Sequence, residues 1–263
     1  RKGMDLYLSR CDGTAATVEE FIACFADVSG RNFDDFFHWY LQAGTPVVDV
    51  SHHYEPEHQR LTLHFKQHTP PTPGQAEKRP LPIPIAYGLI SASGKPLAFN
   101  PRFASQPEGI FMLEGAEGRL VFEGLEEKPV PSLLRHFSAP VRFQINLSND
   151  ELLTLFQHDS DPFNRWQAAQ NVAMAMLVDA ITAAKAGEQI RFNPRFSETL
   201  GALLQNSADH AFVAQVLALP SESDIAREIQ NDIDPDAIYA ARKALREAIG
   251  RQIMPILEKA HDS

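Results

Sequence analysis

The stretch NFDDFFHWYLQAGTPVV, from Asn32 to Val48, marks the point where a helical part of the chain ends and a β-rich part begins. Apolar side chains recur in it at steps of three and four residues, which places them on one face of a helix: Phe33, Phe36, Phe37, Tyr40 and Leu41. Gly44 stands where a helix commonly closes with a left-handed residue, and Thr45-Pro46 cannot continue a helix. Val47 to Val50 then opens an extended run. The sequence therefore predicts a domain junction here.

The composition is that of an ordinary globular protein, with 44% hydrophobic and 22% charged residues. At 263 residues the chain exceeds a typical single domain, so two or three units are expected. With 34 acidic and 24 basic side chains, the formal charge of −10 opposes the phosphate neutralisation that drives nucleic-acid binding. We therefore expect neither nucleic acids nor anionic membranes as partners.

The longest apolar run, Val172 to Val178, has seven residues, whereas a membrane-spanning helix needs about 20. No membrane span is predicted. The chain begins with Arg1-Lys2-Gly3, without an initiating Met or a secretory signal, so we expect a sequence cut from a longer one. The two cysteines, Cys11 and Cys24, allow one bridge at most, which favours a reduced, cytoplasmic setting.

Helical patterns fill residues 1–44. Met4 to Leu8 is typical of the last turns of a helix that Asp12-Gly13 ends. Thr17 and Glu20 form a capping box, in which each side chain satisfies a free backbone N–H of the other residue, and Ser29-Gly30 stops this second helix. The aromatic stretch described above is expected to form the third helix.

Residues 45–145 show the alternation of β-strands. Leu61, Leu63 and Phe65 alternate with polar residues, as in a strand with one buried face. Pro82 to Ile90 indicates a strand whose prolines confine its start to an edge or a bulge. Short strands are also predicted at Phe111–Leu113, Leu120–Phe122 and Val141–Ile145. This spacing favours an antiparallel β-sandwich.

Residues 146–263 return to helical patterns. Ser148 and Glu151 form another capping box, and Asp161-Pro162 opens the strongest helix, which runs to Gly187. Further helices are predicted around Leu200–Leu204 and Phe212–Leu217, and from Asp234-Pro235 onward, where Pro255 should end or kink the last helix. The pattern resembles stacked helical hairpins without an exact repeat.

The fold class predicted is therefore multidomain α+β. A short helical segment (residues 1–44) is followed by an antiparallel, Ig-like β-sandwich (residues 45–145) and an α-helical hairpin array (residues 146–263).

Histidines are the first candidates for chemistry, since five of ten lie between His52 and His68. His52, His53 and His58 stand near Glu55 and Glu57, so a metal site is one interpretation and a solvated polar hairpin turn is the favoured one. His64 falls on the solvent-exposed face of its predicted strand. The sequence contains no His-Glu-x-x-His motif, which excludes a helix-borne catalytic zinc pair within it.

Nucleophile and phosphate-binding motifs are missing as well. The sequence has no Gly-x-Ser-x-Gly elbow, and Cys24 fits a buried thiol of its helix. Gly88 to Lys95 departs from the phosphate-loop spacing and is interpreted as a hairpin turn. Adjacent carboxylates such as Asp34-Asp35 and Glu126-Glu127 are interpreted as solvated charge. We predict no catalytic, cofactor-binding or metal-ligating residue in this chain.

Seven stretches, in order along nearly the whole chain, resemble bacterial-type aminopeptidase N, the alanyl aminopeptidase branch of the zinc-dependent gluzincin family. They are RKGMDLYLSRCDGTAAT (Arg1–Thr17), FFHWYLQAGTPVV (Phe36–Val48), TPPTPGQAEKRPLPIPIAYGL (Thr69–Leu89), PVPSLLRHFSAPV (Pro129–Val141), HDSDPFNRWQAAQ (His158–Gln170), LALPSES (Leu217–Ser223) and NDIDPDAI (Asn231–Ile238). The resemblance implies an internal piece: the last helices of a thermolysin-like catalytic domain, the sandwich third domain, and the start of the C-terminal helical domain.

In that family, zinc is held by His-Glu-x-x-His and a later Glu, a Gly-x-Met-Glu-Asn loop captures the free amino group of the peptide, and a Tyr supports the oxyanion. None of these motifs is present, so no catalytic residue is carried over. Tyr7 and Tyr40 follow the family's Tyr position and are interpreted as helix-packing residues. The resemblance implies zinc and peptide substrates for the parent enzyme, and its remaining domains as partners.

We therefore expect a non-catalytic structural fragment of an aminopeptidase that binds no zinc by itself. Its helices in residues 1–44 should expose apolar surface, because they lack the rest of their domain. The alternative is a free-standing module in which a sandwich edge or a helical groove binds proteins or peptides. A third hypothesis, a hydrolase with an unrecognised site, predicts turnover by the purified chain.

Overall fold

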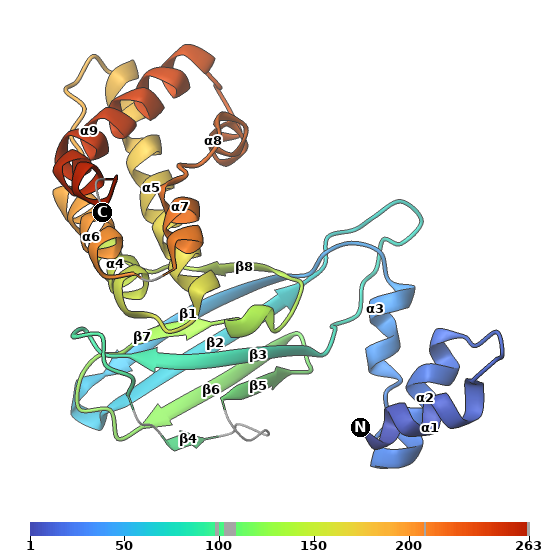
Figure 1. Cartoon of the computed structure of the whole chain (residues 1–263). Helices are drawn as coiled ribbons and strands as arrows, with labels where there is room; N and C mark the ends of the chain where they lie inside the picture. Colours follow the sequence, from blue (N-terminus) through green and yellow to red (C-terminus); the bar gives the residue numbers. More distant parts are fainter. Residues whose placement is uncertain (98–99, 103–108, 208, 262–263) are drawn as a thin grey trace.

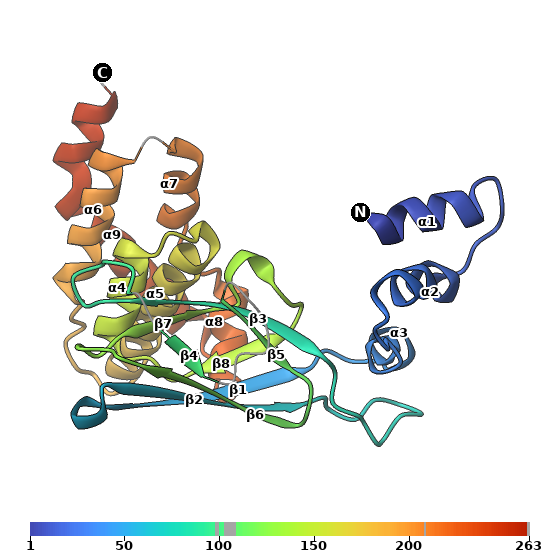
Figure 2. The same ribbon diagram turned by 90° about the horizontal axis from the view of Figure 1, so that it is seen from below.

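Three parts follow one another in the computed structural model, which describes residues 1–97, 100–102, 109–207 and 209–261 (Figure 1). Short helices near the N-terminus stand to one side of two β-sheets, and a helical array covers the opposite end of the sheets (Figures 1 and 2). The predicted fold class, multidomain α+β with a short helical segment, an antiparallel β-sandwich and a helical hairpin array, is confirmed.

The first two helices are α1 (Lys2–Cys11) and α2 (Val18–Ser29). The predicted capping box at the start of α2 is present, because Thr17 N–H donates to Glu20 Oε2 at 2.8 Å and Glu20 N–H donates to Thr17 Oγ1 at 3.2 Å. Gly30 ends α2 in the left-handed conformation. Where α1 and α2 meet, a Cβ on Gly3 would lie 2.6 Å from the ring of Phe25, so the helices approach closely.

The aromatic stretch forms less helix than its pattern predicts. It contains one 3-10 turn, η1 (Asp35–Phe37), and one α turn, α3 (His38–Leu41). Gly44 has a positive φ of 99°, yet α3 ends before it. One reason for the shorter helix is the Asn32 side chain, whose Oδ1 accepts the N–H of Asp34 at 2.6 Å. This bond favours a turn over a helix at the start of the stretch.

The expected exposure of apolar residues in this helical segment is confirmed. The exposed large side chains are Met4, Leu8, Val18, Val28, Tyr40 and Leu41. Just after α3, side-chain amides tie the chain to a loop of the sandwich. Gln42 Nε2 donates to the carbonyl oxygen of Arg79 at 3.1 Å, and Gln75 Oε1 accepts the N–H of Ala43 at 2.7 Å.

The larger sheet has the strand order β4-β6-β2-β1-β8. Its strands are β1 (Val47–Glu55), β2 (Arg60–His68), β4 (Asn100–Arg102), β6 (Glu117–Glu123) and β8 (Arg142–Ile145). Leu61, Leu63 and Phe65 of β2 are fully buried, as their alternation predicts, although Thr62 on the other face is buried too. The pairs β1–β2, β2–β6 and β4–β6 are antiparallel, as predicted, whereas the pair of β1 with β8 is parallel.

The smaller sheet has the order β5-β3-β7, with β3 (Ile83–Ile90), β5 (Ile110–Leu113) and β7 (Val130–Leu133). The prolines of β3 were predicted to confine its start to a sheet edge or a bulge. This holds for the part of β3 that contains Pro84, although β3 is the central strand of its sheet. β5 pairs with Ile83–Ala86 and β7 pairs with Tyr87–Ile90, so Pro84 lies where β3 has a neighbour on one side. The two sheets enclose one apolar core, in which the rings of Phe65 and Phe111 stack 5.0 Å apart.

Six helices form the array: α4 (Asn149–His158), α5 (Pro162–Lys185), α6 (Pro194–Asn206), α7 (His210–Leu217), α8 (Glu222–Ile229) and α9 (Pro235–His261). The predicted capping box of Ser148 and Glu151 starts α4, and Asp161 caps α5 ahead of Pro162. The pattern missed α8, β4 and β7. Within the described ranges, no helix combines the length and apolar character that crossing a membrane requires.

The sequence predicted that Pro255 would either end or kink the last helix. Pro255 does not end α9, which continues to His261. A proline inside a helix removes one backbone hydrogen bond at a cost of about 3 kcal/mol. Apolar packing around the proline opposes this cost. Ile253 is buried, and both Ile253 and Ile256 lie against Gly201 of α6.

Candidate functional site

The histidine-rich segment forms the predicted polar hairpin turn. The 3-10 turn η2 (Pro56–His58) joins β1 to β2, and Gln59 closes it with a φ of 47°. Glu55 accepts hydrogen bonds from Arg60 Nη2 at 2.8 and 3.0 Å, which lower the pKa of this carboxyl. Among the residues that the structure describes, no three His, Cys, Asp or Glu side chains are grouped so that they could hold a metal ion.

His52 points away from this turn toward the helical array, a contact that the sequence did not indicate. Its Nε2 lies 3.6 Å from Glu151 Oε1 at the start of α4. Lys128 Nζ approaches the same oxygen at 2.9 Å. Glu151 Oε2 accepts hydrogen bonds from the backbone N–H of Ser148 at 2.8 Å and from its hydroxyl at 2.9 Å. One carboxylate therefore caps a helix and also joins that helix to the sandwich.

The surroundings of Glu151 keep it ionised. Burial by itself raises the pKa of this carboxyl, since its side chain is only 12% exposed. The hydrogen bonds from Lys128 and Ser148 outweigh burial and lower the pKa from 4.5 to about 2. The contact is therefore an ion pair throughout the neutral pH range.

A second group of polar contacts joins β7 and η3 (Arg135–Phe137) to the start of α5. Asp161, the N-cap of α5, accepts the N–H of His136 at 2.8 Å through Oδ2 and the N–H of Asn164 at 2.9 Å through Oδ1. Asn164 Nδ2 donates to Ser132 Oγ at 2.8 Å and to the carbonyl oxygen of Leu133 at 3.0 Å. Because Asp161 is buried, these bonds are shielded from water.

The η3 segment has an unusual backbone. Leu134, His136 and Phe137 have φ values of 55°, 55° and 57°, a left-handed conformation that residues other than glycine rarely adopt. Such strain persists where surrounding contacts hold it. The bond from His136 N–H to Asp161 supplies one contact, and the ring of Phe137 packs against the ring of Phe163 of α5 with centroids 4.6 Å apart.

Arg135 adds a charged contact at the same place. Its Nη2 lies 3.5 Å from Asp159 Oδ1 and donates to the hydroxyl of Ser160, and both acceptors lie in the α4–α5 connection. Gly88 of β3 makes room for this side chain, because a Cβ there would overlap the guanidinium. The Asp159 side chain is fully buried, and the guanidinium of Arg135 lies beside it.

Apolar packing is continuous across the junction. Ile90 and Val130 are sandwich residues, yet both belong to the buried cluster of the helical array. Gly94, in the turn after β3, lies over the imidazole of His158 at the end of α4, where any side chain would collide with it. Burial, followed by the charge of Arg165, lowers the pKa of His158, which favours the neutral imidazole.

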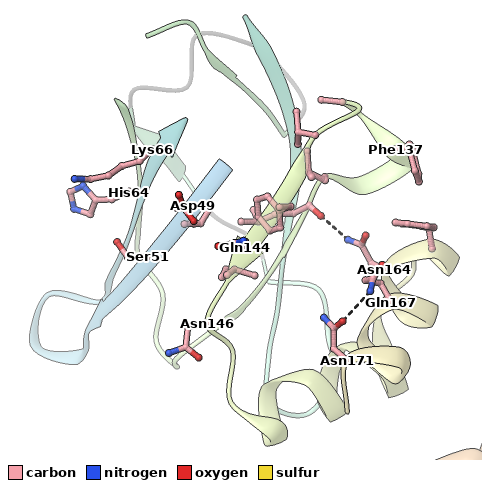
Figure 3. A pocket seen from close by; sticks show the side chains of 18 of the residues that line it. Asp49, Ser51, His64, Lys66, Phe137, Gln144, Asn146, Asn164, Gln167 and Asn171 are labelled. Carbon is pink, nitrogen blue, oxygen red and sulfur yellow. Dashed lines mark hydrogen bonds between the residues drawn. The ribbon is translucent and has the colours of Figure 1, made fainter. Parts of the chain in front are cut away.

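A cleft of about 1120 Å³ opens beside this junction, between β1, β2 and β8 on one side and α5 on the other (Figure 3). Its polar lining is rich in uncharged amides, with few charged groups. Figure 3 shows Asp49, Ser51, His64, Lys66, Gln144, Asn146, Asn164, Gln167 and Asn171. Glu228 also lines the cleft. Phe137 and Phe163 form an aromatic part of the wall.

The other residues discussed from the sequence lie in structural positions. Cys24 is buried, as predicted, and His64 lies on the exposed face of β2. Of the residues Gly88 to Lys95, which were predicted to form a hairpin turn, Gly88 to Ile90 instead belong to β3. Ser91 to Lys95 form the turn, in which Ser91 N–H donates to the carbonyl oxygen of Lys95 at 2.9 Å. Tyr7 packs edge-on against Phe21, with ring centroids 4.9 Å apart.

Comparison with family models divides the chain in two. Residues 44–146 match a domain of unknown function, DUF3458, described as having an Ig-like fold. Residues 149–263 match the domain DUF3458_C, described as ARM repeats. The boundary between the two matches falls at the junction described above.

Curated relatives match nearly the whole chain. Aminopeptidase N of Caulobacter vibrioides is 42% identical over 264 aligned residues, which cover 99% of this chain and 29% of the relative. Aminopeptidase N of Escherichia coli is 35% identical over 254 residues, with 96% and 29% coverage. The chain thus spans less than a third of the length of these relatives.

A solved structure agrees with the sequence relatives. It is the crystal structure of Legionella pneumophila aminopeptidase A in complex with aspartic acid, which is 27% identical and has a TM-score of 0.80. The match covers 98% of this chain and 28% of that protein. Over nearly its full sequence the chain is therefore similar to one part of proteins named aminopeptidase N, and its sandwich and helical array match the domains DUF3458 and DUF3458_C.

Proposed function

We propose that this chain is a non-catalytic structural part of a zinc-dependent, alanyl-type aminopeptidase that removes N-terminal residues from peptides in the cytoplasm. The names of its relatives support the peptidase activity of the whole protein. The chain spans 29% of their length, which leaves room elsewhere for the catalytic groups. The remaining domains of the parent enzyme are its partners in this proposal.

The role proposed is to fix the position of the helical array relative to the rest of the enzyme. The observation that supports it most is the junction itself, where Ile90 and Val130 enter the core of the array. Two polar clusters, centred on Glu151 and Asp161, reinforce the same junction. A rigid support of this kind increases the rate of a reaction through substrate alignment without donating a reacting group.

The zinc of this proposal belongs to the parts of the parent enzyme outside these residues. The described residues provide no group of three ligands, and the sequence lacks His-Glu-x-x-His. We therefore assign no metal ligand and no catalytic step to this chain.

Metal analysis and a turnover assay on the purified 263-residue chain test this assignment. We expect substoichiometric zinc and no cleavage of an alanine anilide substrate. Turnover that a chelator abolishes and added zinc restores would refute the non-catalytic role. A full-length aminopeptidase of this family, assayed in parallel, serves as the positive control.

The structural role has its own test in the full-length parent enzyme. The substitution Asn164→Ala removes two hydrogen bonds that join α5 to β7. We expect it to lower kcat/KM severalfold at unchanged zinc content, because the array is held less firmly. The matched change Asn206→Ala, at an exposed position of α6, should leave kcat/KM unchanged.

An interaction module is the second candidate function, and the cleft beside β8 is the observation that favours it. The reading frame upstream of Arg1 discriminates between the two candidates. A His-Glu-x-x-His motif there supports the enzyme, whereas a start codon directly before Arg1 supports a separate module.

A further inference from the structure

Residues 69–82 connect β2 of the larger sheet to β3 of the smaller one, and we call them the β2–β3 loop. Figures 1 and 2 show this loop extending beyond the ends of the sheets, on the side where α3 lies. A turn within it is closed by two backbone hydrogen bonds: Gln75 N–H donates to the carbonyl oxygen of Thr72 at 2.9 Å, and Thr72 N–H donates to that of Gln75 at 3.1 Å. Gly74 supplies the positive φ, 78°, that such a turn requires. The loop therefore has a defined conformation outside the sheets.

The end of the β2–β3 loop that leads into β3 is anchored in the sandwich. Gln67 of β2 is buried, and its Nε2 donates to the carbonyl oxygens of Leu81 and Gly115, each at 2.8 Å. Its Oε1 accepts the N–H of Leu81 at 2.9 Å, and Leu81 itself is buried. Because this end is fixed, the outer part of the loop can hold a second segment in place.

Two glutamines join the β2–β3 loop to the residues that link α3 to β1. Gln75 Nε2 donates to the carbonyl oxygen of Leu41 at 2.9 Å, and Gln75 Oε1 accepts the N–H of Ala43 at 2.7 Å. Gln42 makes the reciprocal pair, since its Nε2 donates to the carbonyl oxygen of Arg79 at 3.1 Å and its Oε1 accepts the N–H of Arg79 at 2.7 Å. Each side-chain amide thus satisfies a donor and an acceptor of the other segment's backbone.

Lys78 lies at the centre of these contacts and is partly buried. Its Nζ donates to the carbonyl oxygen of Ala43 at 2.9 Å, to Thr72 Oγ1 at 2.7 Å and to Gln75 Oε1 at 2.9 Å. An ammonium group has three N–H donors, so all of them are used. The charge strengthens each bond. One side chain therefore holds the turn, the Gln75 amide and the α3–β1 link together.

Close packing accompanies these bonds. Trp39 of α3 packs against the sandwich core, and its Nε1 donates to the carbonyl oxygen of Pro82 at 3.1 Å. Gly44 has a φ of 99°, and a Cβ there would lie only 3.1 Å from Cγ2 of Thr69. Since α1 and α2 precede α3 in the chain, these contacts set the direction in which residues 1–41 leave the sandwich.

We propose that the β2–β3 loop fixes the orientation of the N-terminal helical segment relative to the sandwich, and that Lys78 is the residue that locks it. The consequence for catalysis rests on the proposed function, with residues 1–44 ending the catalytic domain of the parent enzyme. Lys78 is then a positioning residue, which acts through the backbone of Ala43 and touches no substrate.

A distance distribution measures this orientation in the 263-residue chain. Spin labels at the exposed positions Ala23→Cys, on α2, and Arg119→Cys, on β6, are placed in a Cys11→Ala background, where the remaining Cys24 is buried. Pulsed electron paramagnetic resonance should give one narrow distribution for this chain.

The variant Lys78→Met keeps the length of the side chain and removes its three hydrogen bonds. We expect it to abolish the narrow distribution, because the glutamine pairs alone leave the link free to change direction. The control Lys243→Met, an exposed change on α9, should leave the distribution unchanged. Circular dichroism confirms that both variants are folded.

Amide exchange separates this role of Lys78 from general stabilisation. In Lys78→Met the N–H of Ala43 should exchange about tenfold faster, because its acceptor Gln75 loses a charge-assisted hydrogen bond. The N–H of Leu63 should keep its rate, because β2 is paired on both sides within the sandwich.

An unchanged distance distribution in Lys78→Met would overturn the proposal. Equal acceleration at Ala43 and Leu63 would overturn it too, because Lys78 would then stabilise the whole sandwich. In the full-length parent enzyme, Lys78→Met should lower kcat/KM severalfold at unchanged zinc content. A changed distribution combined with wild-type kcat/KM would support the orienting role of Lys78 and refute the proposed function, so the two failures are distinct.

Discussion

Replacing Glu151 with glutamine is the perturbation that probes the junction most selectively. Glu151→Gln keeps the size of the side chain and removes the negative charge that Lys128 Nζ approaches at 2.9 Å. It also weakens the cap of α4, since the carboxylate accepts two hydrogen bonds from Ser148. The change therefore acts on one helix start and on the contact of that helix with the sandwich.

The size of the stability loss expected for Glu151→Gln follows from the pKa of this carboxyl. Its lowering from 4.5 to about 2 corresponds to roughly 3 kcal/mol of folding free energy, at 1.36 kcal/mol per unit. The Lys128 side chain is 56% exposed, so solvent screens part of this energy. We expect Glu151→Gln to lower the free energy of unfolding by about 1–2 kcal/mol at pH 7.

The lowered pKa of Glu151 also determines how its contribution to stability changes with pH. The unfolded chain takes up a proton at this carboxyl below about pH 4.5, whereas the folded chain does so only near pH 2. Stability from Glu151 is thus complete above pH 4.5 and declines as the pH falls from 4.5 to 2. The measurement is urea unfolding at several pH values, followed by circular dichroism and by tryptophan fluorescence.

In Glu151→Gln this component of the acid destabilisation should be missing. The matched control Glu198→Gln, at an exposed position of α6, should reproduce the wild-type profile. If Glu151→Gln unfolded with the wild-type free energy at pH 7 and with the same acid profile, the reasoning about this ion pair would be refuted.

Three further changes test the packing. Gly94→Ala should destabilise the chain by about 2 kcal/mol more than Gly74→Ala in urea unfolding. Both glycines have a positive φ, but only a Cβ at Gly94 collides with an imidazole of α4; equal losses would contradict that clash. Phe65→Ala should cost about 3–5 kcal/mol in the same assay, because the side chain is fully buried and stacks on another ring; a loss under 1 kcal/mol would argue against this core. Pro255→Ala should stabilise α9 by about 1–3 kcal/mol and slow its amide exchange, since it restores a helical hydrogen bond; faster exchange would mean that the packing of α9 requires the proline.

Local rules predicted those elements whose cause lies within a few residues. The capping boxes at Thr17 and Ser148 and the alternation around Leu63 each depend on neighbours close in sequence, and each is present in the structure. The aromatic stretch after Asn32 was predicted less well, because the side-chain bond of Asn32 competes with helix formation over the same residues. Pro255 was misjudged for the opposite reason, since packing from a distant helix opposes a local preference.

The sequence patterns did not predict the contacts between the sandwich and the helical array, because the residues that make these contacts lie far apart along the chain. His52 and Glu151 are separated by the whole sandwich, and nothing in their spacing links them. The left-handed backbone at His136 likewise depends on Asp161, which comes 25 residues later. The capping role of Glu151 was predicted, whereas its second role depends on the tertiary fold.

The most direct test of the central claim, that the sandwich and the helical array form one rigid support, is a distance distribution measured across the junction. Spin labels at Glu57→Cys, in the β1–β2 turn, and Glu198→Cys, on α6, report this distance by pulsed electron paramagnetic resonance in a Cys11→Ala background. The account predicts one narrow distribution that persists from pH 6 to pH 8. A broad distribution, or two populations of distances, would contradict it.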